Sequence, residues 1–275
     1  MFDIRPSPSF ASPSMHRKTF LTLTGGLALA AIGLPGARAN SNGQALLVAS
    51  DAVRNPGKPF RVTVTLAEFE RGKQVDSSVL HSYSRTVDET GQFASLIQFV
   101  EPARDAGKLL LKSGSDMWFY DPSTKASIRI SPQQRLMGQA ANGDVVTVNF
   151  ARDYKVQDTA DETTADGERR QRSAVKLTLV AAVPDATYPT IELWVDADSS
   201  APIKARFMAE SGRLLKTAYF RRFQRQLGVD RPTETVIIDG VNPQSVTIVR
   251  LTDYQTRRLP TAWFQRDYLP RFEGE

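Results

Sequence analysis

The sequence predicts a mainly β protein built on one large curved antiparallel sheet, or open barrel, with a few helices. Apolar and polar residues alternate in many short segments, which is the pattern of half-buried strands. Turn-forming residues separate these segments at short intervals, and few stretches between them have helical spacing. Strands joined so closely must pair antiparallel, because parallel pairing needs long crossover connections.

In chain order, the first expected element is a helix over Gln44–Arg54, where apolar residues have helical spacing before the breaker run Asn55-Pro56-Gly57. A strand follows from Phe60 to Leu66. Later alternating runs are Val175–Leu179, Ile191–Val195, Ile203–Phe207 and Val246–Ile248. The turn signals between strands are Glu89-Thr90-Gly91, Lys112-Ser113-Gly114, Asp121-Pro122, Ala165-Asp166-Gly167, Asp198-Ser199-Ser200, Ser211-Gly212 and Asp239-Gly240.

Three further segments complete the expected fold. The polar stretch Asp158–Arg172 predicts a mobile hairpin loop, and short helices are expected after Pro132 and near Trp263. So little helix covers the sheet that its interior must either be filled with side chains or leave an apolar cavity. No linker interrupts the pattern, so residues 40–275 are expected to form one domain.

Residues 1–39 are expected to be a leader that is removed on export, with Met15 as the true start. Three regions occur in the order of a secretory signal: basic His16-Arg17-Lys18, apolar Phe20–Leu34 and the cleavage site Ala37-Arg38-Ala39. We therefore expect cleavage after Ala39. The alternative, a membrane anchor, needs about 20 apolar residues, and this run is shorter and ends at Pro35. Arg17-Lys18 resembles a twin-arginine signal with its second arginine replaced, so the export route stays open.

Composition limits the possible functions of the exported chain. The sequence has no cysteine, so it has neither disulfides nor a lipid-carrying residue at the cleavage site. Its net charge is +5, of which residues 1–39 contribute +3, and so small an excess does not favour nucleic acid as a partner. The densest basic stretch contains Arg221, Arg222 and Arg225, and it is expected to be a solvated strand edge.

The chemistry of an enzyme is largely missing. His81 is the only histidine after residue 39, and its setting beside Tyr83 and Arg85 is typical of an exposed strand residue. A zinc site of the usual kind needs several His or Cys ligands. No nucleophile elbow, phosphate loop or dinucleotide motif occurs. We expect no cofactor, no metal and no catalytic site, although a pair of acidic side chains would suffice for glycosidase-type chemistry.

Several short motifs, in order, resemble the outer-membrane lipoprotein-sorting family, the broad LolA-like group. They are Asp116-Met117-Trp118-Phe119-Tyr120-Asp121-Pro122, Ile128-Arg129-Ile130, Met137-Gly138, Asn149-Phe150-Ala151-Arg152-Asp153-Tyr154, Leu193-Trp194-Val195-Asp196, Gly212-Arg213-Leu214-Leu215-Lys216-Thr217, Arg231-Pro232, Leu259-Pro260, Trp263-Phe264 and Leu269. The sequence departs from the family after Met137-Gly138. Members often continue with Asp-Phe and an acidic pair, whereas this chain continues with Gln139-Ala140-Ala141-Asn142-Gly143-Asp144.

The resemblance implies an incomplete antiparallel barrel with helices as a lid over an apolar cavity. It also implies a periplasmic carrier that shields the acyl chains of lipoproteins or other lipids, between an inner-membrane donor complex and an outer-membrane acceptor. The alternatives are a module that binds a hydrophobic ligand or a partner beside an efflux-type complex without transport, and a hydrolase. From the strand alternation, the candidate lining residues are Val62, Val64, Leu109, Leu111, Trp118 and Tyr120. The pattern does not fix which strand face points inward.

Overall fold

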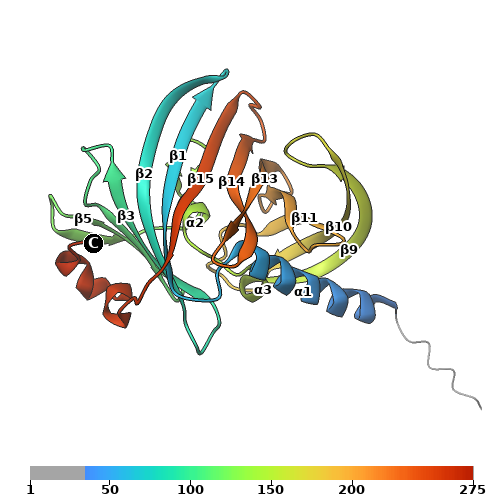
Figure 1. Ribbon diagram of the computed structural model, residues 1–275, viewed down its shortest axis with the longest axis horizontal. Helices are drawn as coiled ribbons and strands as arrows, with labels where there is room; N and C mark the ends of the chain where they lie inside the picture. The colour runs from blue at the N-terminus through green and yellow to red at the C-terminus, as the bar shows by residue number, and fades with distance from the viewer. Residues whose placement is uncertain (1–34, 275) are drawn as a thin grey trace, which may run out of the picture. The chain divides into compact units, whose positions relative to one another are not determined.

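The computed structural model describes residues 35–274, and it confirms the predicted class. Within these residues, one antiparallel sheet of thirteen strands curves without closing into a barrel (Figure 1). A second sheet has two short strands. Residues 1–34 of the predicted leader lie outside the described residues. No helix in the described part of the chain is long and apolar enough to span a membrane.

The strands of the large sheet are β1 (Phe60–Glu70), β2 (Lys73–Thr86), β3 (Phe93–Glu101), β4 (Leu109–Ser113), β5 (Asp116–Asp121), β6 (Ala126–Arg129), β9 (Tyr154–Ala165), β10 (Gln171–Ala181), β11 (Thr190–Asp196), β12 (Pro202–Met208), β13 (Leu214–Gln226), β14 (Val229–Asp239) and β15 (Ser245–Thr256). The small sheet pairs β7 (Arg135–Met137) with β8 (Ala140–Ala141). The helices are α1 (Pro35–Arg54), α2 (Asn142–Val145) and α3 (Phe150–Asp153), with the 3-10 helices η1 (Thr261–Phe264) and η2 (Arg266–Arg271).

The large sheet consists of hairpins joined at one central pairing. Its order is β6-β5-β4-β3-β2-β1-β15-β14-β13-β12-β11-β10-β9. Every neighbour in this order is also a neighbour in sequence, except that β1 pairs with β15 near the end of the chain. β6 and β9 are therefore the two free edges. The predicted turn signals lie between consecutive strands, as the antiparallel topology requires.

The sheet has two faces, and both bury apolar side chains. The inner face carries Val62 and Val64, and it is covered by α1 and by residues 143–150. The outer face carries Tyr83 and Leu111, and on β3 to β5 it is covered by η1 and η2.

Helix α1 packs against β9, α3 and β14, and it shields part of the free edge of β9. The Gln44 amide replaces a neighbouring strand there: its oxygen accepts from the Val156 N–H at 3.0 Å, and its nitrogen donates to the Tyr154 carbonyl at 3.3 Å. The predicted helix over Gln44–Arg54 lies within α1 and ends at the predicted residue. Its end is capped by Arg231, which donates to the carbonyls of Ala52 and Val53.

Two local predictions were wrong. The segment Asp158–Arg172 is a hairpin, but β9 and β10 run through most of it as regular strands, and only its turn is irregular. Many of its side chains are exposed, so the hairpin needs no apolar alternation, and alternation was the signal used to find strands. The stretch directly after Pro132 forms a turn and then β7, and the nearest helix is α2 at Asn142–Val145. The expected helix near Trp263 is present as η1 and η2.

Candidate functional site: a covered apolar cavity

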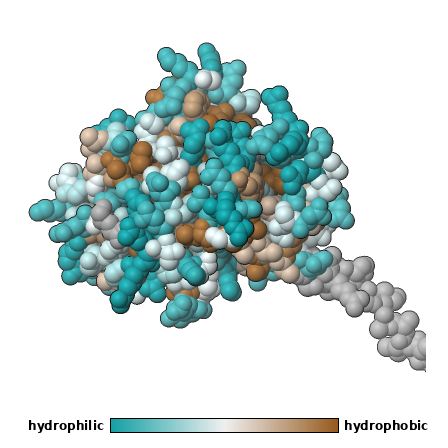
Figure 2. All heavy atoms as spheres, in the orientation of Figure 1, coloured by the Kyte–Doolittle hydropathy of each residue, from teal (hydrophilic) through white to brown (hydrophobic). Residues whose placement is uncertain are grey.

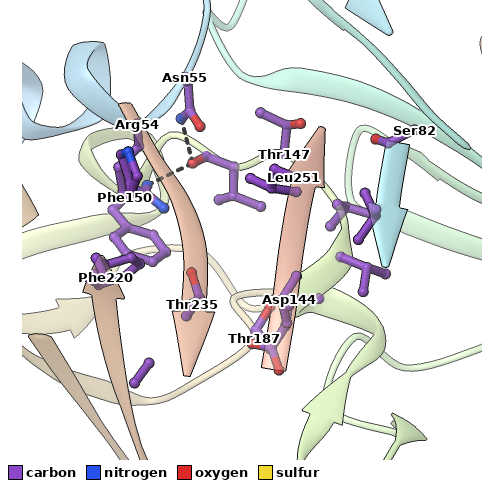
Figure 3. A pocket seen from close by; sticks show the side chains of 18 of the residues that line it. Arg54, Asn55, Ser82, Asp144, Thr147, Phe150, Thr187, Phe220, Thr235 and Leu251 are labelled. Carbon is purple, nitrogen blue, oxygen red and sulfur yellow. Dashed lines mark hydrogen bonds between the residues drawn. The ribbon is translucent and has the colours of Figure 1, made fainter. Parts of the chain in front are cut away.

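A cavity of about 170 Å³ lies between the inner face of the sheet and residues 143–150. β1, β12, β13, β14 and β15 supply its floor, because alternate residues of these strands point to the same side. The apolar floor residues are Phe60, Val62, Val64, Phe207, Ala218, Phe220, Ile237, Val249 and Leu251. Figure 3 shows how several of the lining side chains surround this space.

The roof of the cavity is the segment from Gly143 to Phe150, called the cover below. Its apolar lining residues are Val145, Val146, Val148 and Phe150. Polar contacts fasten it to the end of α1. The Arg54 guanidinium and the Asn55 amide both donate to the Val148 carbonyl at 2.9 Å (Figure 3), and the Asn55 amide also donates to Asn149 Oδ1 at 2.8 Å. Each such bond adds only about 1 kcal/mol net, so the cover is fastened by separable contacts.

A ladder of hydroxyl groups holds the middle of the cover to β2 and β3. The Ser84 Oγ lies 2.8 Å from Thr147 Oγ1 and 3.0 Å from Ser95 Oγ. The Thr147 N–H donates to Ser95 Oγ at 3.2 Å. Small hydroxyl side chains therefore occupy inner-face positions where neighbouring strands carry large apolar ones, which leaves space for the cover and satisfies its polar groups.

A buried ion pair closes one end of the cavity. Lys216 on β13 binds Asp144 of the cover, and their side chains are 6% and 12% exposed. The Asp144 carboxylate also accepts from the Tyr188 hydroxyl at 2.9 Å and from the Ala141 N–H at 2.7 Å. Burial, together with the Asp144 charge, raises the pKa of Tyr188 well above its usual range. All these groups have partners, so the network is a structural clamp without a free nucleophile or base.

The family-divergent loop Gln139–Asp144 belongs to this clamp. The Gln139 carbonyl accepts from Lys216 at 3.0 Å, and its N–H donates to Thr247 Oγ1 at 2.7 Å. Gly143 has no room for a side chain, because a Cβ there would lie 2.1 Å from Thr187 Oγ1. The sequence analysis missed this loop, Lys216 and the cover as parts of one site. The only local signal was the apolar run Val145-Val146-Thr147-Val148.

The structure separates the six predicted lining residues into two groups. Val62 and Val64 line the cavity. The other four, Leu109, Leu111, Trp118 and Tyr120, lie on the outer face, where they pack with residues of the C-terminal segment. Trp118 also stacks against the Arg266 guanidinium at 4.3 Å. The structure therefore does not bring the six together, and contact of Val62 and Val64 with a ligand stays a prediction.

His81 lies on β2, beside Arg61. Its Nε2 is 2.7 Å from Arg61 Nη2, and burial together with the guanidinium charge lowers the pKa of the imidazole. Among the described residues, no group of three His, Asp or Glu side chains is arranged to hold a metal ion. The site therefore offers an apolar surface beneath a cover that hydrogen bonds and an ion pair hold in place.

An open antiparallel sheet with a covered apolar cavity on its inner face defines the class of this protein, and comparison with known structures agrees. The chain is 32% identical to a LolA superfamily protein from Nitrosomonas europaea, with a TM-score of 0.73, covering 82% of this chain and 98% of that one. This chain therefore belongs to the LolA superfamily. A family model described only as an uncharacterized protein matches residues 91–271.

Two more distant structures share the fold. A DUF1329 family protein from Desulfovibrio piger is 21% identical with a TM-score of 0.69, covering 84% of this chain and 99% of that one. A putative outer membrane lipoprotein-sorting protein domain from Vibrio parahaemolyticus is 19% identical with the same TM-score, covering 84% and 100%. No curated protein matches the sequence.

Proposed function

We propose that this protein is a periplasmic carrier that shields acyl chains of lipoproteins or other lipids on the way to the outer membrane. The observation that carries the proposal is the apolar cavity beneath a cover held by hydrogen bonds. Each CH₂ moved into water costs about 0.8 kcal/mol, so an acylated cargo does not cross an aqueous compartment unaided. An apolar lining lowers this cost, and the carrier needs no catalytic group.

The size of the cavity sets a condition on this function. A space of 170 Å³ is close to that of a cavity that holds one benzene molecule, and it is too small for several acyl chains. Loading therefore requires the cover to move away from β1 and β15. The bonds from Arg54, Asn55 and Ser84 would break, while the Lys216–Asp144 ion pair could hold the other end of the cover as a hinge. The valines of the cover would then extend the apolar surface.

Photo-crosslinking tests the proposal with a matched pair of positions. Val64 and Leu111 are 2% and 0% exposed, but they lie on opposite faces of the sheet. A photo-reactive residue at Val64 should capture lipid or lipoprotein in cells, whereas one at Leu111 should capture none. A fluorescent fatty acid should also bind in a saturable way, and Val64→Glu should weaken binding because a carboxylate buried beside acyl chains is costly. Equal capture at both positions, or none at Val64, would contradict the proposal.

The small size of the cavity also favours a second candidate, a module that binds one small hydrophobic molecule or a partner without transport. Mass spectrometry of lipids that copurify from the native envelope separates the two. Acylated lipid in stoichiometric amount supports the carrier. A single small hydrophobic compound, with an unchanged distribution of lipoproteins in cells that lack the protein, supports the binding module.

A further inference from the structure

The hairpin formed by β13 and β14 extends past its neighbour β12 and presents an unusual surface. Pairing between β12 and β13 ends at the pair of Lys204 and Tyr219, so residues 220–226 of β13 have no partner from β12. The hairpin closes with the two-residue turn Leu227-Gly228, between the paired residues Gln226 and Val229. Residues 222–225 and 227–230 are exposed.

Apolar side chains gather at this turn. Eight large apolar side chains of the described residues are exposed, and three of them, Phe223, Leu227 and Val229, lie on this one hairpin. The face of the molecule in Figure 2 is mostly hydrophilic, with small hydrophobic patches among charged side chains. Exposed apolar residues are therefore concentrated beside one turn, between positions 223 and 229.

Leu227 is an unfavourable residue for the position it occupies. Both turn residues have positive φ, 49° for Leu227 and 89° for Gly228, a conformation in which asparagine or aspartate is preferred before glycine. The β1–β2 hairpin has the same kind of turn, but there Arg71, a polar residue, precedes Gly72. A bulky apolar side chain held at positive φ and left partly exposed costs stability, and such costs are typical of positions kept for function.

The same hairpin carries a net positive charge. From position 221 to position 234 it carries four arginines and two acidic residues, and Arg250 on β15 adds a fifth arginine. Glu234 is buried and forms ion pairs with three of these arginines, Arg221, Arg222 and Arg250. Arg222 is 61% exposed even so, and Arg225 is exposed closer to the turn. Two arginines near the β9–β10 turn differ, because Arg170 and Arg172 have their own carboxylates, Asp166 and Asp196.

We infer that the β13–β14 turn docks on the surface of an anionic phospholipid bilayer. Apolar side chains at a turn insert at the boundary between headgroups and acyl chains, and arginines beside them pair with phosphate and anionic headgroups. Protection of a strand edge from pairing would explain the arginines, but it would not explain Phe223, Leu227 and Val229 beside them. The inference is independent of cargo, since residues 222–230 at the end of this hairpin do not line the cavity.

The absence of cysteine permits a clean fluorescence test. Gln226→Cys places a polarity-sensitive fluorophore beside Leu227, and Asn242→Cys places the same probe beside Val241, which is 72% exposed at the β14–β15 turn. With vesicles containing phosphatidylglycerol, we expect a blue shift of the Gln226→Cys probe and no shift at Asn242→Cys. Pure phosphatidylcholine vesicles should give a much weaker shift. Salt at about 1 M, where the Debye length is about 3 Å, should reverse the binding.

Unlabelled variants separate binding from folding. Leu227→Asn should keep or raise the unfolding temperature, because asparagine suits the turn, while it lowers the vesicle partition coefficient about tenfold or more. Arg222→Gln and Arg225→Gln should each lower that coefficient about fivefold. Equal shifts at both probe positions, equal binding to neutral vesicles, or unchanged binding of Leu227→Asn would overturn the inference. A shift with a soluble acidic peptide but with no vesicle would overturn it too, in favour of a protein partner.

Discussion

The inner and outer faces of the sheet are both apolar on the central strands, yet they are filled in different ways. On the outer face, the C-terminal segment packs Leu259, Phe264 and Leu269 onto β3, β4 and β5. Aromatic rings meet there edge to face, with Tyr83 5.5 Å from Trp263 and 5.6 Å from Phe272. On the inner face, the cover packs Val145 and Val146 into the core and is also fastened by polar contacts, yet it leaves a cavity.

The difference shows that strand alternation alone does not make a binding site. Each face of this sheet can bury a ligand or a piece of its own chain, and the covering segment decides which. An aromatic, apolar segment gives a closed core, because packing and burial act together over its whole area. The cover also buries Val145 and Val146 in the inner core, but it leaves a cavity beside them, so its packing against the sheet is incomplete.

The largest expected effect comes from removing the C-terminal segment that covers the outer face. A chain that ends at Arg258 loses three buried apolar side chains of the C-terminal segment. Each contributes about 1.5–3 kcal/mol, so the loss approaches the whole stability of a typical domain, about 5–15 kcal/mol. Urea unfolding followed by circular dichroism should show a much lower midpoint, or no folded state. A chain that ends at Phe272 is the control, and equal midpoints for the two truncated chains would contradict the outer core described here.

The second prediction concerns the clamp of the inner face. Lys216→Met leaves Asp144 buried without its cation, which costs about 3–5 kcal/mol in comparable pairs. Lys204→Met is the matched control, because Lys204 lies 4.2 Å above the Trp194 ring on the outer face, and its loss should cost about 1 kcal/mol or less. Calorimetry of both variants measures the difference. If the two variants lose the same amount of stability, the Lys216–Asp144 ion pair does not hold the cover.

Much of the fold could be predicted from sequence, because strand alternation and turn residues are local signals. The face of the sheet to which each side chain points could not be predicted in the same way. Leu109, Leu110 and Leu111 are consecutive and all buried, since both faces of β4 are covered, so the segment has no alternation from which to assign a face. Leu110 points to the inner face and its two neighbours to the outer one.

The cover was also beyond sequence reasoning. Its position depends on contacts between residues far apart in the chain, such as Arg54 with the Val148 carbonyl and Ser84 with Thr147. No local pattern connects those positions. The two lining residues that the sequence did locate, Val62 and Val64, belong to a strand that alternates clearly and has only one apolar face.

The third prediction compares two buried alanines, one on each face. Ala218 is 3% exposed and lines the cavity, whereas Ala94 is 2% exposed within the outer core. Ala218→Leu should change stability by less than about 1 kcal/mol, because the cavity accepts the added methyl groups, but it should reduce binding of a fluorescent fatty acid. Ala94→Leu should destabilise by about 1–3 kcal/mol through overpacking, with binding retained. Similar stability losses in both variants would mean that the inner face is as tightly packed as the outer.

The smallest expected effect lies at His81, which is on β2 and does not line the cavity. Burial and Arg61 lower the pKa of His81 in the folded protein, so between that lowered value and the ordinary value of 6.5 the unfolded chain binds more protons. Stability should therefore decline slightly as pH falls below 6.5 toward the folded-state pKa. His81→Gln should remove this part of the pH dependence. Titration of urea midpoints between pH 7 and pH 5 measures it.

The same variant also tests whether His81, the single histidine after residue 39, has a role in function. Because His81 does not line the cavity, His81→Gln and His81→Ala should bind the fluorescent fatty acid with unchanged affinity. Arg61→Gln is the companion variant: it removes the charge that helps to lower the pKa of the imidazole, so the folded-state pKa should move closer to 6.5 and the decline in stability should end at a higher pH and be smaller. Loss of binding in His81→Ala with native circular dichroism would place function on the polar region around His81, and the cavity would no longer be sufficient to explain it.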